Sequence, residues 1–293
     1  MVGLLALMLA PLARADDAAF RRQQDIIYGR KDGMALTMDV FQPKQTNGFG
    51  IVFAVSAGWV SSKGMISPPL YKVFLDNGYT VFAVVHGSQP KFQIPEITRD
   101  MNRAVRFIRH NAARFGIDPN HIGMSGMSAG GHLALIIGTQ GGKGDAKARD
   151  AVDRESSAVQ CVACFFPPTD FVNYGGTHTN LLTEIPDQYK GAFGNIPSDL
   201  EARQKYAESI SPIYWITTNL PPTLIIQGNI DMVVPAQQAI SFRDRAGALG
   251  DTVKVIVKNW QGHGWNDYQP DMESCVDWFD HYLRGKKTDQ PAH

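Results

Sequence analysis

Short apolar runs alternate along this chain with longer segments in which apolar residues recur at helical spacing. An apolar run of about four to eight residues between turn-forming residues predicts a buried strand, whereas the wider spacing predicts a helix. The predicted strands cover residues 24–28, 35–41, 51–55, 81–85, 121–124, 159–166, 223–227 and 253–257. The predicted helices cover residues 70–77, 97–115, 130–138, 236–249 and 272–283.

The order of these segments predicts the fold class. The first two predicted strands form an antiparallel pair around the turn Lys31-Asp32-Gly33, and most of the later strands are separated by helices. Strands that alternate with helices build parallel sheets that are covered on both faces. We therefore expect an α/β fold with a mostly parallel, eight-stranded sheet and helices on both faces. Ligands of such sheets bind beyond the carboxyl ends of the strands.

Residues 167–211 interrupt the alternation. This segment is rich in Pro, Gly, Asn, Thr and aromatic residues, and only residues 200–209 have a clear helical pattern. A long irregular segment in a compact domain is usually a binding loop or a lid. We expect a lid-like insertion over the ligand cleft, and an inert surface loop is the alternative.

The composition excludes some classes of partner. The chain has 293 residues, with 28 Lys and Arg against 28 Asp and Glu. Because it has no net charge and no basic run mixed with aromatic residues, nucleic-acid binding is disfavoured. The length fits one large domain, which we place at residues 16–293. The patterns assign no oligomeric state.

The first residues have the composition of a signal peptide. Residues 1–11 are almost wholly apolar, and Ala13-Arg14-Ala15 has small residues at the two positions that a signal peptidase reads. We expect a signal peptide over residues 1–15, cleavage after Ala15, and a secreted or periplasmic protein. A buried N-terminal helix is the alternative. The apolar run is too short to cross a bilayer, so no membrane span is expected.

The three cysteines do not predict a disulfide framework. Cys161 and Cys164 lie in one apolar run that reads as a strand, and Cys275 is far from both in sequence. Residues three apart in a strand point to opposite faces, with Cα atoms roughly 10 Å apart, which is too far for a disulfide. We expect these thiols to pack in the core. No Cys and His residues have zinc-ligand spacing, so no metal is expected.

The pentapeptide Gly126-Met127-Ser128-Ala129-Gly130 stands between a predicted strand and a predicted helix. A serine on such a sharp turn needs glycines two positions to either side, so that strand and helix approach closely while Oγ projects into a cleft. The context therefore predicts that Ser128 is the nucleophile of an acyl-transfer reaction.

A serine hydroxyl needs a base and an acid that orients the base. His263, in Gly262-His263-Gly264-Trp265, follows the last predicted strand and is the expected base. Asp231 follows the strand at 223–227 and is the expected acid, with Asp170 as the alternative. His132 lies just inside the helix after Ser128, where we expect it to pack beneath the turn.

From about residue 32 to residue 283 the chain resembles the α/β-hydrolase superfamily. The closest resemblance is to its carboxylesterase branch, which includes acetyl xylan and feruloyl esterase-like enzymes and the hormone-sensitive-lipase-like group. The matching segments are residues 116–134, residues 227–235 and residues 262–265, in the same order as in that family. The resemblance implies ester hydrolysis through an acyl-enzyme without a cofactor. The expected substrate is a small or polymeric ester, including acetyl or feruloyl esters of plant polysaccharides.

One segment departs from the family pattern. Such esterases usually have His-Gly-Gly-Gly or His-Gly-Gly-Trp after the third strand, whereas this chain has Ser56-Ala57-Gly58-Trp59. The resemblance implies an oxyanion hole made by backbone N–H groups, which we assign to Ala129 and to Gly58 or Trp59.

Substrate contacts are expected from four side chains, namely Trp59, His86, Tyr174 and Trp265. Phe92 and Phe193 fit either the site or the core. Two other functions stay open at this point. One is a serine peptidase of the prolyl-oligopeptidase type, and the other is a noncatalytic binding protein with the same fold.

Overall fold

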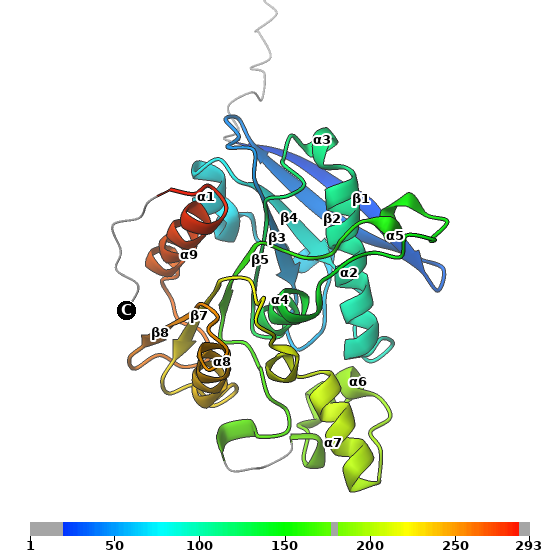
Figure 1. Cartoon of the computed structure of the whole chain (residues 1–293), viewed down its shortest axis with the longest axis vertical. Coiled ribbons are helices and arrows are strands. Elements are labelled where there is room, and N and C mark those ends of the chain that lie inside the picture. Colours follow the sequence, from blue (N-terminus) through cyan, green and yellow to red (C-terminus); the bar gives the residue numbers. More distant parts are fainter. Residues whose placement is uncertain (1–19, 177–180, 287–293) are drawn as a thin grey trace, which may run out of the picture.

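The computed structural model describes residues 20–176 and 181–286, and these residues form one sheet of eight strands (Figure 1). The strands are β1 (Phe20–Lys31), β2 (Met34–Pro43), β3 (Gly50–Val55), β4 (Thr80–Val85), β5 (Ile122–Met127), β6 (Cys161–Phe165), β7 (Thr223–Gly228) and β8 (Val253–Lys258). Their order across the sheet is β1-β2-β4-β3-β5-β6-β7-β8. The pairs β1–β2 and β2–β4 are antiparallel, and the other pairs are parallel. The predicted fold class is confirmed.

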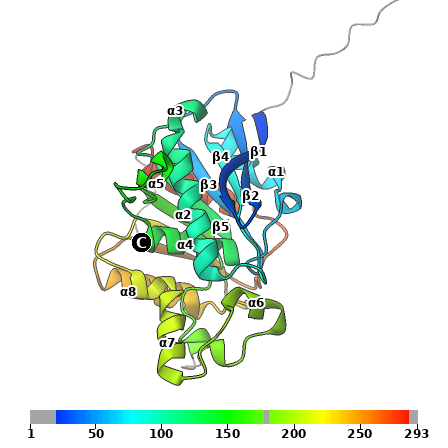
Figure 2. The ribbon, with the colours of Figure 1, turned by 90° about the vertical axis from the view of Figure 1, so that its right-hand side faces the viewer.

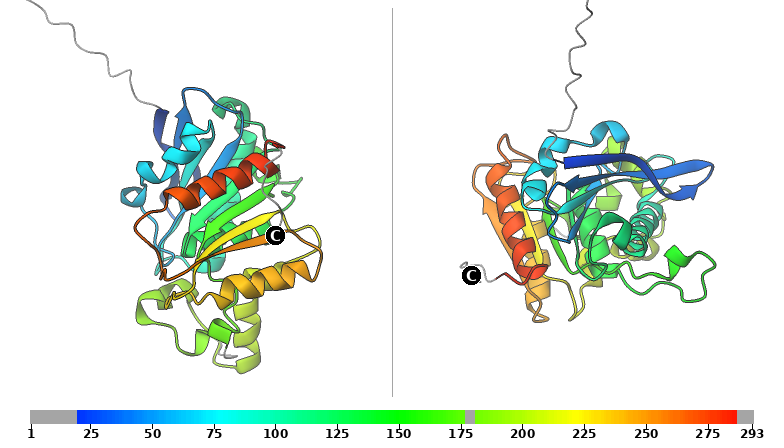
Figure 3. Two further views of the ribbon diagram at one scale, coloured as in Figure 1. Left: turned by 90° about the vertical axis from the view of Figure 1, so that its left-hand side faces the viewer. Right: turned by 90° about the horizontal axis from the view of Figure 1, so that it is seen from above.

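Helices cover both faces of the sheet (Figures 2 and 3). The helices are α1 (Pro68–Asp76), α2 (Ile94–His110), α3 (Ala112–Phe115), α4 (Ala129–Gln140), α5 (Ala151–Arg154), α6 (Lys190–Phe193), α7 (Leu200–Ser209), α8 (Gln237–Gly247) and α9 (Gln269–Tyr282). Side chains of α1 and α9 pack in one core cluster with one face of the sheet. Side chains of α2, α4 and α8 pack in a second cluster on the other face. The central strands are buried on both faces, which explains their continuous apolar runs.

The helix predicted at residues 97–115 starts too late and is interrupted at residue 111, although helical structure does end at Phe115. It begins earlier, at Ile94, because Gln93 and Glu96 form a capping box and Pro95 is tolerated in the first turn. The helix stops at His110. The short α3 follows it and is capped by Gly116, which has a left-handed backbone conformation with φ 64°. Capping by side chains is a local effect that hydrophobic spacing does not report.

The three thiols are buried in the core, as predicted, and none of them is paired. Cys161 belongs to the core cluster on one face of the sheet and Cys164 to the cluster on the other face. Burial raises the pKa of each of the three thiols above its usual value. These groups pack in the core as small apolar side chains.

The insertion at 167–211 lies beyond the carboxyl ends of the strands, where α6 and α7 are seen together at one end of the molecule (Figures 1 and 2). Its first residues are held by the buried side chain of Gln238 on α8. The Oε1 atom of Gln238 accepts hydrogen bonds from the N–H groups of Thr169 and Asp170, both at 2.7 Å. Its Nε2 atom donates to the carbonyl oxygens of Asp170 (3.1 Å) and Asn173 (3.3 Å).

Across the described ranges, no helix has the length and hydropathy needed to cross a membrane. The predicted signal peptide at residues 1–15 lies outside the described residues.

Replacing Gln238 with Met should destabilise the protein by at least about 2 kcal/mol, because each buried polar group left without a partner costs roughly 1–3 kcal/mol. The free energy of unfolding in urea measures this change. Gln204→Met, on the exposed surface of α7, is the control and should stay within about 0.5 kcal/mol of the parent. Equal unfolding midpoints for the two variants would show that Gln238 does not anchor the insertion.

Candidate active site

Ser128 lies on the tight turn between β5 and α4. Its φ of 52° and ψ of −120° are rare for a residue with a side chain. The flanking glycines allow this turn, since a Cβ on Gly126 would lie 2.4 Å from the carbonyl oxygen of Gly130. A Cβ on Gly130 would lie 2.5 Å from the carbonyl oxygen of Ala54 on β3. The close approach of helix and strand that the pentapeptide predicted is therefore present.

Ser128, His263 and Asp231 form a hydrogen-bonded chain. The Ser128 Oγ atom is 2.8 Å from His263 Nε2, and His263 Nδ1 is 2.8 Å from Asp231 Oδ2. The three residues follow β5, β8 and β7, so the carboxyl edge of the sheet brings them together. The ring of Phe166 lies against the imidazole, with the ring centroids 4.7 Å apart. This arrangement can move a proton away from the serine hydroxyl.

The Asp231 carboxylate is held ionised. Burial raises its pKa, but the hydrogen bonds from His263 and from the N–H groups of Val234 and Val233 outweigh burial, so the pKa lies below its usual value. Both N–H groups donate to Oδ1 at 2.8 Å. Asp170, the alternative acid, accepts hydrogen bonds from the N–H groups of Val172 and Asn173 instead. The geometry thus pairs His263 with Asp231.

Residues 57–60, which we call the 57–60 turn, form a two-residue hairpin beside Ser128. Ala57 and Val60 exchange two backbone hydrogen bonds, of 3.0 and 2.9 Å. Gly58 and Trp59 between them have φ values of 53° and 60°, the signature of a type I′ turn. Within the described residues, the N–H groups of Gly58, Trp59 and Ala129 have no acceptor. These donors are free to bind an anionic oxygen. The segment Ser56-Ala57-Gly58-Trp59, which departs from the family motif, thus still offers backbone N–H groups without an acceptor among the described residues.

The indole of Trp59 is fixed from below by His132 on α4. Its Nε1–H donates to His132 Nδ1 at 3.2 Å, and His132 Nε2 bonds the carbonyl oxygen of Ile210 at 2.8 Å. Because Ile210 offers only an acceptor, the His132 proton must sit on Nε2 and the ring must be neutral. Burial lowers the pKa of His132 to about 4. His132 therefore packs beneath the turn, as the sequence indicated.

A cavity of about 350 Å³ opens onto Ser128 and Ala129. The insertion supplies much of its wall through Phe171, Tyr174, Tyr189 and Phe193, and Trp59 completes it. Sequence reasoning named Trp59 and Tyr174 as substrate contacts but missed Tyr189, because nothing in an aperiodic segment tells which of its side chains face inward.

Two expected substrate contacts lie outside this cavity. His86 is buried behind it, where its Nδ1 bonds the carbonyl oxygen of Gly87 at 2.6 Å, and burial lowers its pKa to about 4. Trp265 packs against Phe166, with ring centroids 5.6 Å apart, and donates from Nε1 to Asp271. Trp265 thus supports the aromatic ring that contacts His263. Phe92, which fitted either the site or the core, is buried in the core.

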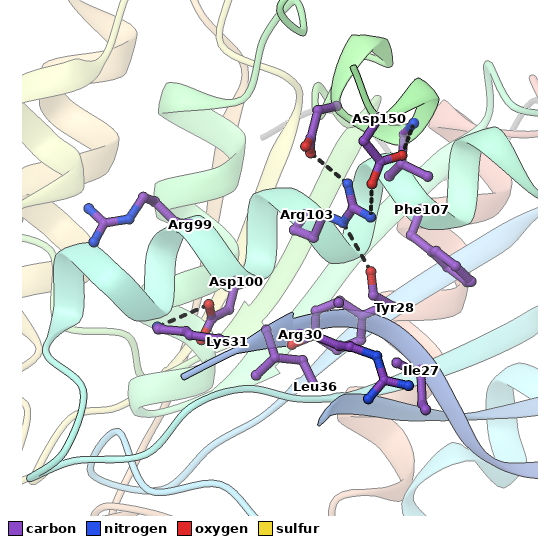
Figure 4. Close-up of a pocket in the computed structure, with 13 residues that line it drawn as sticks. Ile27, Tyr28, Arg30, Lys31, Leu36, Arg99, Asp100, Arg103, Phe107 and Asp150 are labelled. Atoms are coloured by element: carbon purple, nitrogen blue, oxygen red, sulfur yellow. Dashed lines mark hydrogen bonds and ion pairs between the residues drawn. The ribbon is translucent and has the colours of Figure 1, made fainter. Parts of the chain in front are cut away.

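A second cavity, of about 710 Å³, lies between the β1–β2 hairpin and α2 (Figure 4). Several of its charged side chains pair with each other, as in the ion pair between Lys31 and Asp100 at 3.1 Å and the one between Arg103 and Asp153 at 2.7 Å. The hydrogen-bonded chain of Ser128 does not reach it. Among the described residues, no group of His, Cys, Asp and Glu side chains converges to hold a metal ion.

Comparison with known proteins identifies relatives of this chain. The family described as BD-FAE matches residues 38–245. Esterase LipC of Mycobacterium tuberculosis is 24% identical over 246 residues, which cover 82% of this chain and 59% of LipC. The chain thus spans little more than half the length of this relative.

Two solved structures share the fold. The truncated form of a carbohydrate esterase from gut microbiota has a TM-score of 0.74 and 24% identity, covering 92% of this chain and 99% of that one. An acetyl ester-xyloside bifunctional hydrolase from Caldicellulosiruptor lactoaceticus has a TM-score of 0.68 and 21% identity, covering 89% and 92%.

Replacing His132 with Gln should make the free energy of unfolding less dependent on pH. The pKa of His132 is lowered on folding from 6.5 to about 4. Between these values the unfolded chain binds a proton that the folded chain does not, so stability falls as the pH falls. Between pH 7 and pH 4.5 the variant should lose about 2 kcal/mol less than the parent.

Urea unfolding at the two pH values measures this difference. Leu133→Ala is the control, since it removes core packing on the same helix and no titrating group; it should lower stability equally at both pH values. An unchanged pH dependence in the His132 variant would contradict a neutral buried imidazole.

Proposed function

The chain belongs to the BD-FAE family of α/β-hydrolases, and we propose on this basis that it is a serine carboxylesterase that works through an acyl-enzyme. The observation that carries the proposal is the continuous chain from Asp231 through His263 to Ser128, with both hydrogen bonds at 2.8 Å. Ala129 and the 57–60 turn line the same cavity as Ser128, and their backbone N–H groups have no acceptor among the described residues. A nucleophile, a base with its orienting acid, and oxyanion donors are the parts that acyl transfer requires.

The mechanism follows from these positions. Ser128 Oγ attacks the ester carbonyl carbon while His263 Nε2 takes its proton, and Asp231 stabilises the imidazolium that forms. The N–H groups of Ala129 and of the 57–60 turn bind the oxyanion of the tetrahedral intermediate. When the intermediate collapses, His263 returns the proton to the departing alcohol. Water then attacks the acyl-enzyme by the same route, releasing the carboxylic acid and restoring Ser128.

We propose esters of plant polysaccharides, acetyl or feruloyl, as the substrate class. Relatives of this fold include a carbohydrate esterase and an acetyl ester-xyloside hydrolase. Large apolar side chains also stand exposed on the loops that carry the catalytic groups. Met232 is 92% exposed next to Asp231, and Trp260 is 82% exposed three residues before His263. An exposed aromatic face on the loop that carries His263 suits the apolar face of a sugar ring.

Trp260 is held in place by its neighbours. It has a φ of 62°, and its N–H donates to Asn229 Oδ1 at 2.7 Å. The N–H of Ile230 donates to the carbonyl oxygen of Gln261, which joins the loop after β7 to the loop after β8. A residue whose backbone is already fixed loses less conformational freedom when its side chain binds a ligand.

We also propose that the protein acts outside the cytoplasm. The proposal rests on the apolar residues 1–11 and on the small residues of Ala13-Arg14-Ala15. Polysaccharide esters are found in the surroundings of the cell, so export and the proposed substrate agree.

Replacing Ser128 with Ala should lower kcat for p-nitrophenyl acetate roughly 10⁴-fold or more, because the nucleophile is lost. A fluorophosphonate should label the parent protein and not the variant. Ser125→Ala is the matched control, since Ser125 is a buried serine of β5, the strand that precedes Ser128, and its Oγ has no partner among the described residues; this variant should keep its activity.

The same assays separate the other functions. Full activity in the Ser128 variant would refute the mechanism, and a parent that is neither labelled nor active would favour a noncatalytic binding protein. Faster hydrolysis of a proline amide than of the matched ester would favour a peptidase.

Replacing Trp260 with Ala should raise KM for acetylated xylan several-fold, since an aromatic contact contributes about 0.5–1.5 kcal/mol. Hydrolysis of p-nitrophenyl acetate, which is too small to reach the indole, should change less than about twofold. Leu200→Ala, which removes an apolar side chain that is 76% exposed on α7, is the control. Equal effects on the two substrates would argue against a sugar-binding role for Trp260.

A further inference from the structure

The direction of the Trp59 N–H is set by a side chain outside the 57–60 turn. The carbonyl of Gly58 and the N–H of Trp59 belong to one planar trans peptide, so they point in opposite directions. Gln89 Nε2 donates to the Gly58 carbonyl oxygen at 2.6 Å, and the Gln89 backbone N–H donates to the Trp59 carbonyl oxygen at 3.2 Å. Gln89 thus keeps the Gly58 carbonyl pointing toward the Gln89 side chain, and the Trp59 N–H of the same peptide therefore points away from Gln89.

The turn has a second conformation within reach. Type I′ and type II′ turns differ by a flip of the middle peptide, and only type I′ needs a positive φ at the second central residue. The residue pair Gly58-Trp59 suits type II′, which puts glycine first and leaves Trp59 unstrained. The structure nevertheless has type I′, with Trp59 at a φ of 60°. In the flipped turn, a carbonyl oxygen would occupy the place of the oxyanion donor.

We propose that Gln89 is a positioning residue that keeps the 57–60 turn in its oxyanion-binding conformation and couples that conformation to the docking of the insertion. This inference rests on the proposed esterase function. Gln89 touches no reacting atom, and it acts by orienting the peptide between Gly58 and Trp59.

The coupling runs through the same amide group. Gln89 Nε2 also donates to the carbonyl oxygen of Gln188 in the insertion, at 2.9 Å. Both acceptors are carbonyl oxygens, so only the amide nitrogen can occupy this position. One NH₂ group therefore joins the turn to the insertion. The hydrogen bond to Gln188 holds the amide where it can bind Gly58, and the hydrogen bond to Gly58 holds it where it can bind Gln188.

Packing reinforces this link. A Cβ on Gly58 would lie 2.8 Å from the ring of Tyr189, so the insertion presses directly on the turn. A Cβ on Gly191 would lie 2.6 Å from Pro90 Cβ and 2.7 Å from Gln89 Oε1. A displaced insertion would remove these contacts together with one of the two acceptors of Gln89.

The test uses two variants of Gln89. Gln89→Met keeps the length of the side chain but removes the donor, and Gln89→Glu keeps the shape but sets carboxylate oxygens against two carbonyl oxygens. Loss of an oxyanion donor lowers kcat about 10²–10³-fold, and we expect both variants to lower kcat for p-nitrophenyl acetate about 10-fold or more. KM and the melting temperature should change little.

A readout of the oxyanion hole separates positioning from a general structural defect. A trifluoromethyl ketone adds to Ser128 Oγ and leaves an oxyanion in the hole, so its affinity should fall in step with kcat. The pH profile of kcat/KM should keep its shape, since the chain from Asp231 to Ser128 is untouched.

The coupling to the insertion is tested with Gly191→Ala, whose new methyl group pushes the insertion away from Gln89. This variant should also lower kcat, and combining it with Gln89→Met should lower kcat little further. Gly142→Ala, where a Cβ meets nothing within 4 Å, is the control and should leave kcat unchanged. Fully multiplicative effects of the two substitutions would overturn the coupling.

Two results would overturn the positioning role itself. One is a kcat and an inhibitor affinity within about twofold of the parent in both Gln89 variants. The other is a loss confined to KM. A parent protein that hydrolyses no ester and is not labelled by a fluorophosphonate would refute the proposed function instead, so the two failures are distinguishable.

Discussion

The close approach of α4 to the end of β5 is the constraint on which the rest of the site depends. Without side chains at Gly126 and Gly130, the helix starts within contact distance of the sheet and Ser128 takes its rare backbone conformation. The same approach leaves the N–H of Ala129 without an acceptor among the described residues. One turn of helix later, His132 reaches the indole of Trp59. One steric condition thus places the proposed nucleophile, one proposed oxyanion donor and the support of the second.

The remaining groups depend on loops that are held by buried polar contacts. Asp231 accepts hydrogen bonds from two backbone N–H groups of its own loop. The Tyr174 hydroxyl of the insertion donates a hydrogen bond to the carbonyl oxygen of Val233 in that loop. Gln238 fixes the start of the insertion, and the carbonyl oxygen of Ile210 near its end accepts a hydrogen bond from His132 Nε2. The insertion is therefore attached to the loop of Asp231, to α4 and to the 57–60 turn. These contacts give the wall of the cavity a defined position relative to Ser128.

Sequence reasoning reached the fold because short apolar runs report burial on both faces of a parallel sheet. It placed Ser128, His263 and Asp231 because each follows a strand, and the carboxyl ends of parallel strands meet at one edge. It misplaced His86 and Trp265, which also follow strands, because periodicity does not tell whether a side chain after a strand turns into the cleft or back into the core. The contacts of Gln89 had no sequence signal, since they join a polar loop residue to carbonyl groups.

The two buried thiols of β6 have a practical consequence. Cys161 and Cys164 project from opposite faces of one strand, and Cys275 packs in the core on α9, so no pair of them closes a covalent cross-link. Folding of the described residues then needs no disulfide formation or rearrangement. With respect to its thiols, the described part of the chain can therefore fold in a reducing cytosol as well as in an oxidising compartment, so recombinant protein made inside a bacterial cell should have the same fold as protein made in an oxidising one.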